Sequence, residues 1–177
     1  REVAPSAATD KLFLDLQGKP LPFIEGVVSG LSVGVPGTLS VLETAHKEHG
    51  KLPWATLMQP AIQLAEQGFK LSPRLHRALL EENHLINDPV AASYFYDAQR
   101  KPHPVGFVLK NPELADILRD IAVRGSLALK QGPVAEALVQ KVRQHPTRPG
   151  GMTLQDLANY KVKKREPLCF DHAIQTT

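Results

Sequence analysis

Few residues of this chain are of types that do chemistry, and their spacing forms no catalytic motif. His46 and His49 are three residues apart in a predicted helix, so both imidazoles can face one way, as metal ligands must. No third ligand is signalled nearby, which favours a pair of surface histidines. The chain has no HExxH, GxSxG or P-loop spacing. Spacing alone therefore predicts no catalytic residue, no metal site and no cofactor.

The single cysteine, Cys169, cannot form an internal disulfide and belongs to no CxxC pair. Its sequence neighbours are Leu168 and Phe170, so we expect a buried structural thiol. One such cysteine leaves the redox compartment of the protein open.

The composition indicates a globular chain without a nucleic-acid or membrane partner. Hydrophobic residues make up 42% and charged residues 22% of 177 residues, and the net charge is only +3. The densest basic run, residues 161–165, lacks the wider basic face of a nucleic-acid site and is interpreted as solvated surface. The longest uncharged stretch runs from Gly26 up to Glu43 and contains several glycines and Pro36, so it is no membrane span.

Helical periodicity dominates the chain from residue 38 onward. Ser72 and Asn111 each precede a proline and are typical helix N-caps, while Thr153 and Asp156 have the spacing of a capping box. Gly125 is placed to end a helix. The predicted helices cover about residues 38–49, 54–67, 73–83, 112–124, 133–145 and 154–160.

Four of these helices carry apolar stripes that we expect to face a core, and those of residues 112–124 and 133–145 are Leu114, Ile117, Leu118 and Ile121, and Val134, Leu138 and Val142. The stripe of residues 38–49 is Leu39, Leu42 and Ala45. That of residues 54–67 is Trp54, Leu57, Met58, Ala61, Leu64 and Ala65, and Pro60 within it should kink the helix or restart it. Residues 1–37 and 87–110 are predicted to be mostly irregular, with the aromatic run 94–96 packed under a loop. Residues 162–170 form the best remaining strand candidate. The predicted fold is mainly α, with a few peripheral strands.

Ordered motifs along the chain resemble the γ-glutamyltranspeptidase family. Residues 1–9 (REVAPSAAT) are similar to the family's R-E-x-A-P-x-x-A-T segment, and residues 35–38 to its x-P-G-[TS] turn. Residues 50–69 resemble its most recognisable large-subunit stretch. Residues 150–160 followed by 165–168 resemble G-G-x-[IL]-T-x-x-D-L-x-x-Y and then R-x-P-[IL]. The order and spacing also match, so the resemblance covers nearly the whole chain.

The resemblance implies an N-terminal-nucleophile hydrolase, in which a precursor cleaves itself and a new N-terminal threonine of the small subunit attacks the γ-glutamyl carbonyl. Residues 1–177 would then be a partial segment of the large subunit of an αββα fold, without the upstream core strands and the downstream catalytic subunit. Arg1 matches the family arginine that binds the α-carboxylate of the glutamyl group, as a guanidinium fork can.

The implied partners are the small subunit of the same precursor and glutathione or other γ-glutamyl compounds, and the implied location of the parent is periplasmic or extracellular. Two alternatives stay open: a cephalosporin or glutaryl acylase of the same family, and a stand-alone helical binding module. Under the family interpretation, we expect the isolated chain to be inactive and to self-associate through apolar surface.

Overall fold

The computed structural model describes residues 2–169, of which about 52% are helical. The described residues form eight α-helices: α1 (Phe23–Val27), α2 (Thr38–His49), α3 (Trp54–Gln67), α4 (Pro73–Glu81), α5 (Pro89–Phe95), α6 (Pro112–Arg124), α7 (Pro133–Arg143) and α8 (Leu154–Asn159). Three 3-10 helices join them: η1 (Gly30–Ser32), η2 (Leu85–Asn87) and η3 (Gly125–Leu129). The prediction of a mainly α fold is confirmed.

Strands contribute little to the described part of the chain. β1 (Phe69–Lys70) and β2 (Val108–Leu109) pair antiparallel, with Phe69 opposite Leu109. The strand predicted for residues 162–170 is wrong over its described part, because residues 162–169 contain no strand. A strand needs a neighbour to pair its backbone groups, and no described segment lies in register beside these residues.

The predicted helix ends are confirmed where a local signal sets them. The side chains of Ser72, Asn111 and Thr153 each accept a hydrogen bond from a backbone N–H in the first turn of their helix. Gly125 ends α6 with φ +62°, a left-handed conformation in which a side chain is strained.

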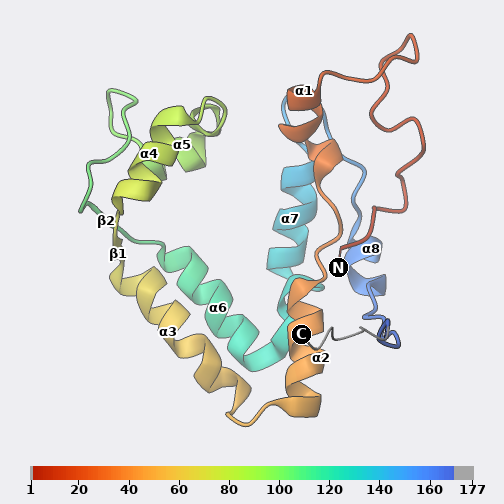
Figure 1. The fold of residues 1–177 in the computed structure, drawn as a ribbon, viewed down its shortest axis with the longest axis vertical. Coiled ribbons are helices and arrows are strands. Elements are labelled where there is room, and N and C mark those ends of the chain that lie inside the picture. Colours follow the sequence, from red (N-terminus) through yellow and green to blue (C-terminus); the bar gives the residue numbers. More distant parts are fainter. Residues whose placement is uncertain (1, 170–177) are drawn as a thin grey trace, which may run out of the picture.

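α3 and α6 pack side by side as an antiparallel pair with its own small core (Figure 1). Ile62, Ala65 and Ala115 are buried between the two helices. α3 continues through Pro60, so of the two outcomes predicted, a kink or a restart, the restart does not occur. Pro60 is exposed, which leaves water free to solvate the carbonyl that loses its helical partner.

The predicted apolar stripes of α2 and α3 are only partly buried. Leu42 on α2 is 54% exposed, and Leu64 on α3 is 56% exposed. The buried position on α2 is instead Ser40, which lies on another side of the helix from Leu42. Each helix has apolar residues on more than one side, and the residues that the structure describes leave Leu42 and Leu64 more than half exposed.

Two further clusters lie at the other parts of the molecule. Leu71, Leu79, Tyr96 and Leu109 pack within the α4–α5 lobe, where the Tyr96 hydroxyl donates to the Leu79 carbonyl at 3.2 Å. The aromatic run therefore packs as predicted, but helix α5, capped by Asp88, falls in a stretch predicted to be irregular. The other cluster joins α7 to α8 and consists of Val35, Ala135, Val142, Met152, Leu157 and Tyr160.

η3 connects helices α2, α6 and α7, because it contacts all three. The Glu43 carboxylate of α2 accepts hydrogen bonds from the Ser126 N–H, at 2.8 Å, and from Lys47 Nζ, at 2.7 Å. Burial raises the pKa of Glu43, but these bonds outweigh it and lower the pKa from 4.5 to about 2. Glu43 thus joins two segments that are 83 residues apart.

Two other findings concern surface properties. Among residues 2–169, no helix has both the length and the apolar character that crossing a bilayer requires. Cys169 is exposed, so the prediction of a buried thiol is wrong. Its apolar neighbour Leu168 is also exposed, because no described element packs on this part of the chain.

Candidate functional site

The residue predicted to bind substrate, Arg1, lies outside the described residues. The structure describes the segment that follows it, from Glu2 onward. We therefore build the site from Glu2–Ala8, called here the N-terminal segment, and from the elements that hold it.

The first anchor of the N-terminal segment is at Val3. Its carbonyl accepts a hydrogen bond from the Val35 N–H at 2.8 Å, which forms an isolated antiparallel bridge. Val35 is 1% exposed and belongs to the α7–α8 cluster. Gly34 lies close beside the bridge, since a Cβ placed there would be 2.9 Å from Cγ of Glu2. The segment that follows Arg1 is thus tied to a buried valine.

The second anchor is Asp156 in the first turn of α8. Its Oδ2 accepts from the Thr153 N–H at 2.9 Å and the Asp156 N–H donates to the Thr153 hydroxyl at 3.1 Å, which completes the predicted capping box. Oδ2 also accepts from the Thr153 hydroxyl at 2.8 Å. Its Oδ1 accepts from the Ser6 N–H at 2.9 Å. Burial raises the pKa of Asp156, but the bonds from Ser6 and Thr153 outweigh it and lower the pKa to about 2. Asp156 is therefore a carboxylate at neutral pH.

Close backbone approaches explain the glycine pair in the loop before α8. A Cβ on Gly151 would lie 2.7 Å from the Ala7 Cβ, and a Cβ on Gly150 would overlap the backbone of Gly30. Gly150 also donates to the Val142 carbonyl at 2.9 Å. The pair lets this loop lie against both the N-terminal segment and η1, so these glycines have a packing role.

A small cavity of about 120 Å³ lies beside the N-terminal segment. Glu2 and Val3 line one part of it, and Lys161, Lys163 and Arg165 add three exposed cationic side chains. Lys164, from the same run, pairs with Glu48 at 2.6 Å and is 80% exposed. The basic run is therefore solvated surface, as predicted, and it adds positive charge next to the residues that follow Arg1.

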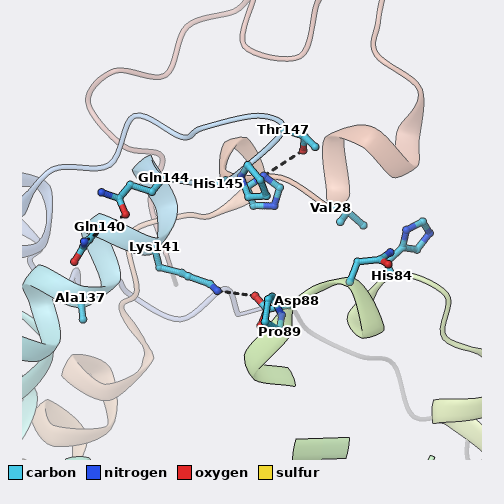
Figure 2. Close-up of a pocket in the computed structure, with 12 residues that line it drawn as sticks. Val28, His84, Asp88, Pro89, Ala137, Gln140, Lys141, Gln144, His145 and Thr147 are labelled. Carbon is cyan, nitrogen blue, oxygen red and sulfur yellow. Dashed lines mark hydrogen bonds and ion pairs between the residues drawn. The ribbon is translucent and has the colours of Figure 1, made fainter. Parts of the chain in front are cut away.

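A larger cavity of about 650 Å³ lies between the α4–α5 lobe and α7 (Figure 2). Lys141 of α7 reaches across it to Asp88, with 2.6 Å between Nζ and Oδ2. His84 and His145 also line it, and the Thr147 hydroxyl lies 3.3 Å from His145 Nδ1.

The Thr147–His145 contact is local rather than catalytic. The same Nδ1 lies 3.4 Å from the Arg148 N–H, so the imidazole closes a turn. The cavity contains no residue that the sequence predicted to act on substrate, and a hydroxyl beside an imidazole needs a third group to orient the base.

The two histidines considered as metal ligands are engaged separately. His46 Nε2 lies 2.8 Å from the Leu52 carbonyl, and its ring meets Trp54 edge-on at 5.2 Å between centroids. His49 is 78% exposed and lies 3.6 Å from Glu48. Within residues 2–169, no three His, Cys, Asp or Glu side chains are grouped so that they could hold a metal ion.

Sequence reasoning explained Asp156 through capping and did not find its bond to Ser6. The two residues are 150 positions apart, and neither carries a local signal for the contact. The available hints were the adjacent glycine pair and the second carboxylate oxygen of Asp156, because the capping box here uses only one oxygen.

A family model described as Gamma-glutamyltranspeptidase matches residues 1–176. The glutathione hydrolase proenzyme of Pseudomonas aeruginosa is 36% identical over 171 residues, which are 97% of this chain and 29% of that protein. Glutathione hydrolase 2 of Arabidopsis thaliana is 39% identical over 170 residues, 95% of this chain and 28% of that protein. The chain thus spans less than a third of the length of these relatives.

Solved structures show the same arrangement. The crystal structure of Helicobacter pylori gamma-glutamyltranspeptidase matches with a TM-score of 0.86 and 33% identity, over 95% of this chain and 47% of that chain. A cephalosporin acylase from Bacillus halodurans matches with a TM-score of 0.68 but 22% identity, over 96% of this chain and 32% of that chain. The second likeness concerns the fold alone.

Proposed function

Because the chain belongs to the γ-glutamyltranspeptidase family, we propose that it is the helical part of the large subunit of a γ-glutamyl-transferring enzyme. The whole enzyme would cleave the γ-glutamyl bond of glutathione and pass the glutamyl group to water, an amino acid or a peptide. The observation that carries the proposal is the match of one family over residues 1–176, a range that contains all the motifs quoted above.

Arg1 is the residue of this chain that we assign to substrate. Its guanidinium would bind the α-carboxylate of the glutamyl group through two parallel hydrogen bonds. The bridge of Val3 to Val35 and the bond of Ser6 to Asp156 support this role, because they hold the segment that begins directly after Arg1.

The nucleophile would come from outside this chain, as the N-terminal threonine of a small subunit. The names of several relatives include the word proenzyme, which is consistent with a precursor that is cleaved into two parts. The small subunit is thus the proposed partner, and γ-glutamyl compounds are the proposed substrates. The isolated chain should release no γ-glutamyl group.

The two alternatives are less well supported. The acylase likeness, at 22% identity, carries no information on the acyl group. A stand-alone helical module should bury its apolar faces, but Leu42, Leu57 and Leu64 are each more than 40% exposed. Apolar faces of this kind fit a chain that packs on the remainder of a larger protein.

The test uses the full-length precursor that contains this segment, assayed with glutathione and with γ-glutamyl-4-nitroanilide. The wild type should release the γ-glutamyl group, and Arg1→Lys should lower kcat/KM roughly ten- to a hundredfold, mostly through KM. A 4-aminobutanoyl anilide, which lacks the α-carboxylate, should be almost insensitive to the change.

Three results would contradict the proposal. A wild-type precursor that matures but leaves both γ-glutamyl substrates intact would remove the assigned activity. Equal losses of Arg1→Lys on the anilides with and without the α-carboxylate would show that Arg1 acts through structure. Turnover by the rigorously purified isolated chain would place a nucleophile within residues 1–177.

A further inference from the structure

The Asp156 carboxylate interacts with Ser6, through the Ser6 N–H and its side chain, in a way that helix capping does not require. Oδ2 serves the capping box, with both of its bonds to Thr153. Oδ1 accepts from the backbone N–H of Ser6 at 2.9 Å, from the other end of the described chain. One oxygen therefore stabilises α8, and the other holds the N-terminal segment.

The Ser6 amide is well placed to transmit this contact toward Arg1. The Ala8 N–H donates to the Pro5 carbonyl at 2.9 Å, which closes a turn with Ser6 at its second position. On the other side, Val3 is bridged to Val35. The short stretch from Val3 to Ser6 is thus fixed at both ends, on two different elements.

Charge makes the bond to Ser6 stronger than a neutral one. An N–H that donates to an ionised carboxylate forms a charge-assisted hydrogen bond, roughly twice as strong as its neutral counterpart. An amide in place of the carboxylate keeps an oxygen acceptor but removes this charge. The Asp156→Asn change therefore weakens both functions of the side chain without emptying its position.

We propose that Asp156 is a positioning residue for the substrate role assigned to Arg1: its carboxylate fixes the Ser6 amide and thereby the backbone path of the N-terminal segment, which begins directly after Arg1. This inference rests on the proposed function of Arg1. It assigns to a helix-capping residue an effect on substrate affinity.

The test uses the full-length precursor with Asp156→Asn, Ser6→Pro and Ser6→Ala. Proline suits the second position of a turn and removes the donated N–H, whereas alanine keeps the N–H and removes only the hydroxyl. Asp88→Asn is the matched control, because Asp88 also caps a helix, accepting from the Val90 and Ala91 N–H groups, but lies in another lobe.

Asp156→Asn and Ser6→Pro should each raise KM for γ-glutamyl-4-nitroanilide roughly five- to thirtyfold with a smaller change in kcat. Asp88→Asn should reproduce little of this rise, whereas Ser6→Ala, which keeps the N–H bond to Asp156 but loses the hydroxyl that also interacts with the carboxylate, should give an intermediate one. Subunit formation and the midpoint of thermal unfolding are measured for every variant, so that a variant that fails to mature is recognised. If Asp156→Asn fails to mature, the KM of Ser6→Pro tests the proposal instead.

A double-mutant cycle separates positioning from general destabilisation. If Asp156 acts through Arg1, Asp156→Asn should add little to the loss that Arg1→Lys already causes. Fully additive losses, or a KM for Asp156→Asn and Ser6→Pro no higher than that of Asp88→Asn, would overturn the inference. A wild-type precursor without γ-glutamyl release would instead overturn the proposed function itself.

Discussion

Acid titration of Glu43 tests whether the hydrogen bonds of its carboxylate stabilise the junction of α2 and η3. The side chain of Glu43 is 19% exposed, and its carboxylate binds the Ser126 N–H and Lys47 Nζ. A fall in pKa from 4.5 to about 2 sets an upper bound of about 3 kcal/mol of stabilisation at neutral pH, at about 1.4 kcal/mol per pH unit. Solvent screening reduces it, because the largest cause of the fall is Lys47, which is 71% exposed. The pKa is lower in the folded state, so this stabilisation is present above about pH 4.5 and is lost as the pH falls toward 2.

The substitution Glu43→Gln should cost less than the full ~3 kcal/mol. Glutamine keeps an oxygen that can accept from the Ser126 N–H, and the pair with Lys47, which is 71% exposed, contributes little. Glu43→Gln replaces a charge-assisted hydrogen bond by a neutral one, so the free energy of unfolding should fall by about 1–2 kcal/mol at pH 7. Since the glutamine amide cannot titrate, the gap in stability between the variant and the wild type should close as the pH approaches 2.

The assay is urea unfolding of the isolated chain at pH 7, 5, 4 and 3, followed by far-ultraviolet circular dichroism and by the fluorescence of Trp54, the single tryptophan. Trp54 lies near this junction, since its Nε1 donates to the Ile121 carbonyl at 3.0 Å. Lys47→Ala is the control, because it removes the exposed partner and should change stability by less than about 1 kcal/mol. Parallel pH profiles for wild type and Glu43→Gln would refute the reasoning.

Two further predictions concern packing and association. Gly37→Ala should destabilise the chain by about 1–3 kcal/mol, because the new Cβ would overlap the Tyr160 ring. Thermal unfolding measures this loss of stability, and an unchanged midpoint would show that the ring moves aside without cost. The isolated chain should self-associate through exposed apolar residues such as Leu16 and Phe23, which are 100% and 85% exposed. Light scattering should give the double variant Leu16→Ser/Phe23→Ser a smaller mass than the wild-type chain. A wild-type chain that stays monomeric at high concentration would contradict this second expectation.

Local signals made the helix ends predictable. Ser72, Asn111 and Thr153 cap their helices through residues within one turn, so a short window of sequence contains both donor and acceptor. The same signal, a capping residue followed by proline, stands at Asp88, but α5 was missed because its seven residues are too few to establish an apolar period. Short helices of this kind depend on tertiary packing, here around Tyr96.

Tertiary choices were less predictable than local ones. Ile62 rather than Leu64 faces α6, because α3 has apolar residues on both sides and sequence periodicity does not say which side receives the partner. The bonds from Ser6 to Asp156 and from Ser126 to Glu43 join residues 150 and 83 positions apart. No local pattern specifies such contacts, so the anchors of the candidate site appeared only in three dimensions.

The motifs that carry the family resemblance contain hardly any side chain able to do chemistry, and their positions explain why. Gly37 packs on Tyr160, the pair Gly150 and Gly151 lies against Gly30 and Ala7, and Asp156 binds Ser6. The 35–38 and 150–160 motifs thus meet the N-terminal segment or the cluster that holds it, while residues 50–69 belong to α3 and its separate core. The required property at the glycine positions is close backbone approach, which glycine permits and larger residues exclude. In the proposed function, this part of the large subunit therefore acts as a rigid holder for Arg1, and the reacting groups lie elsewhere.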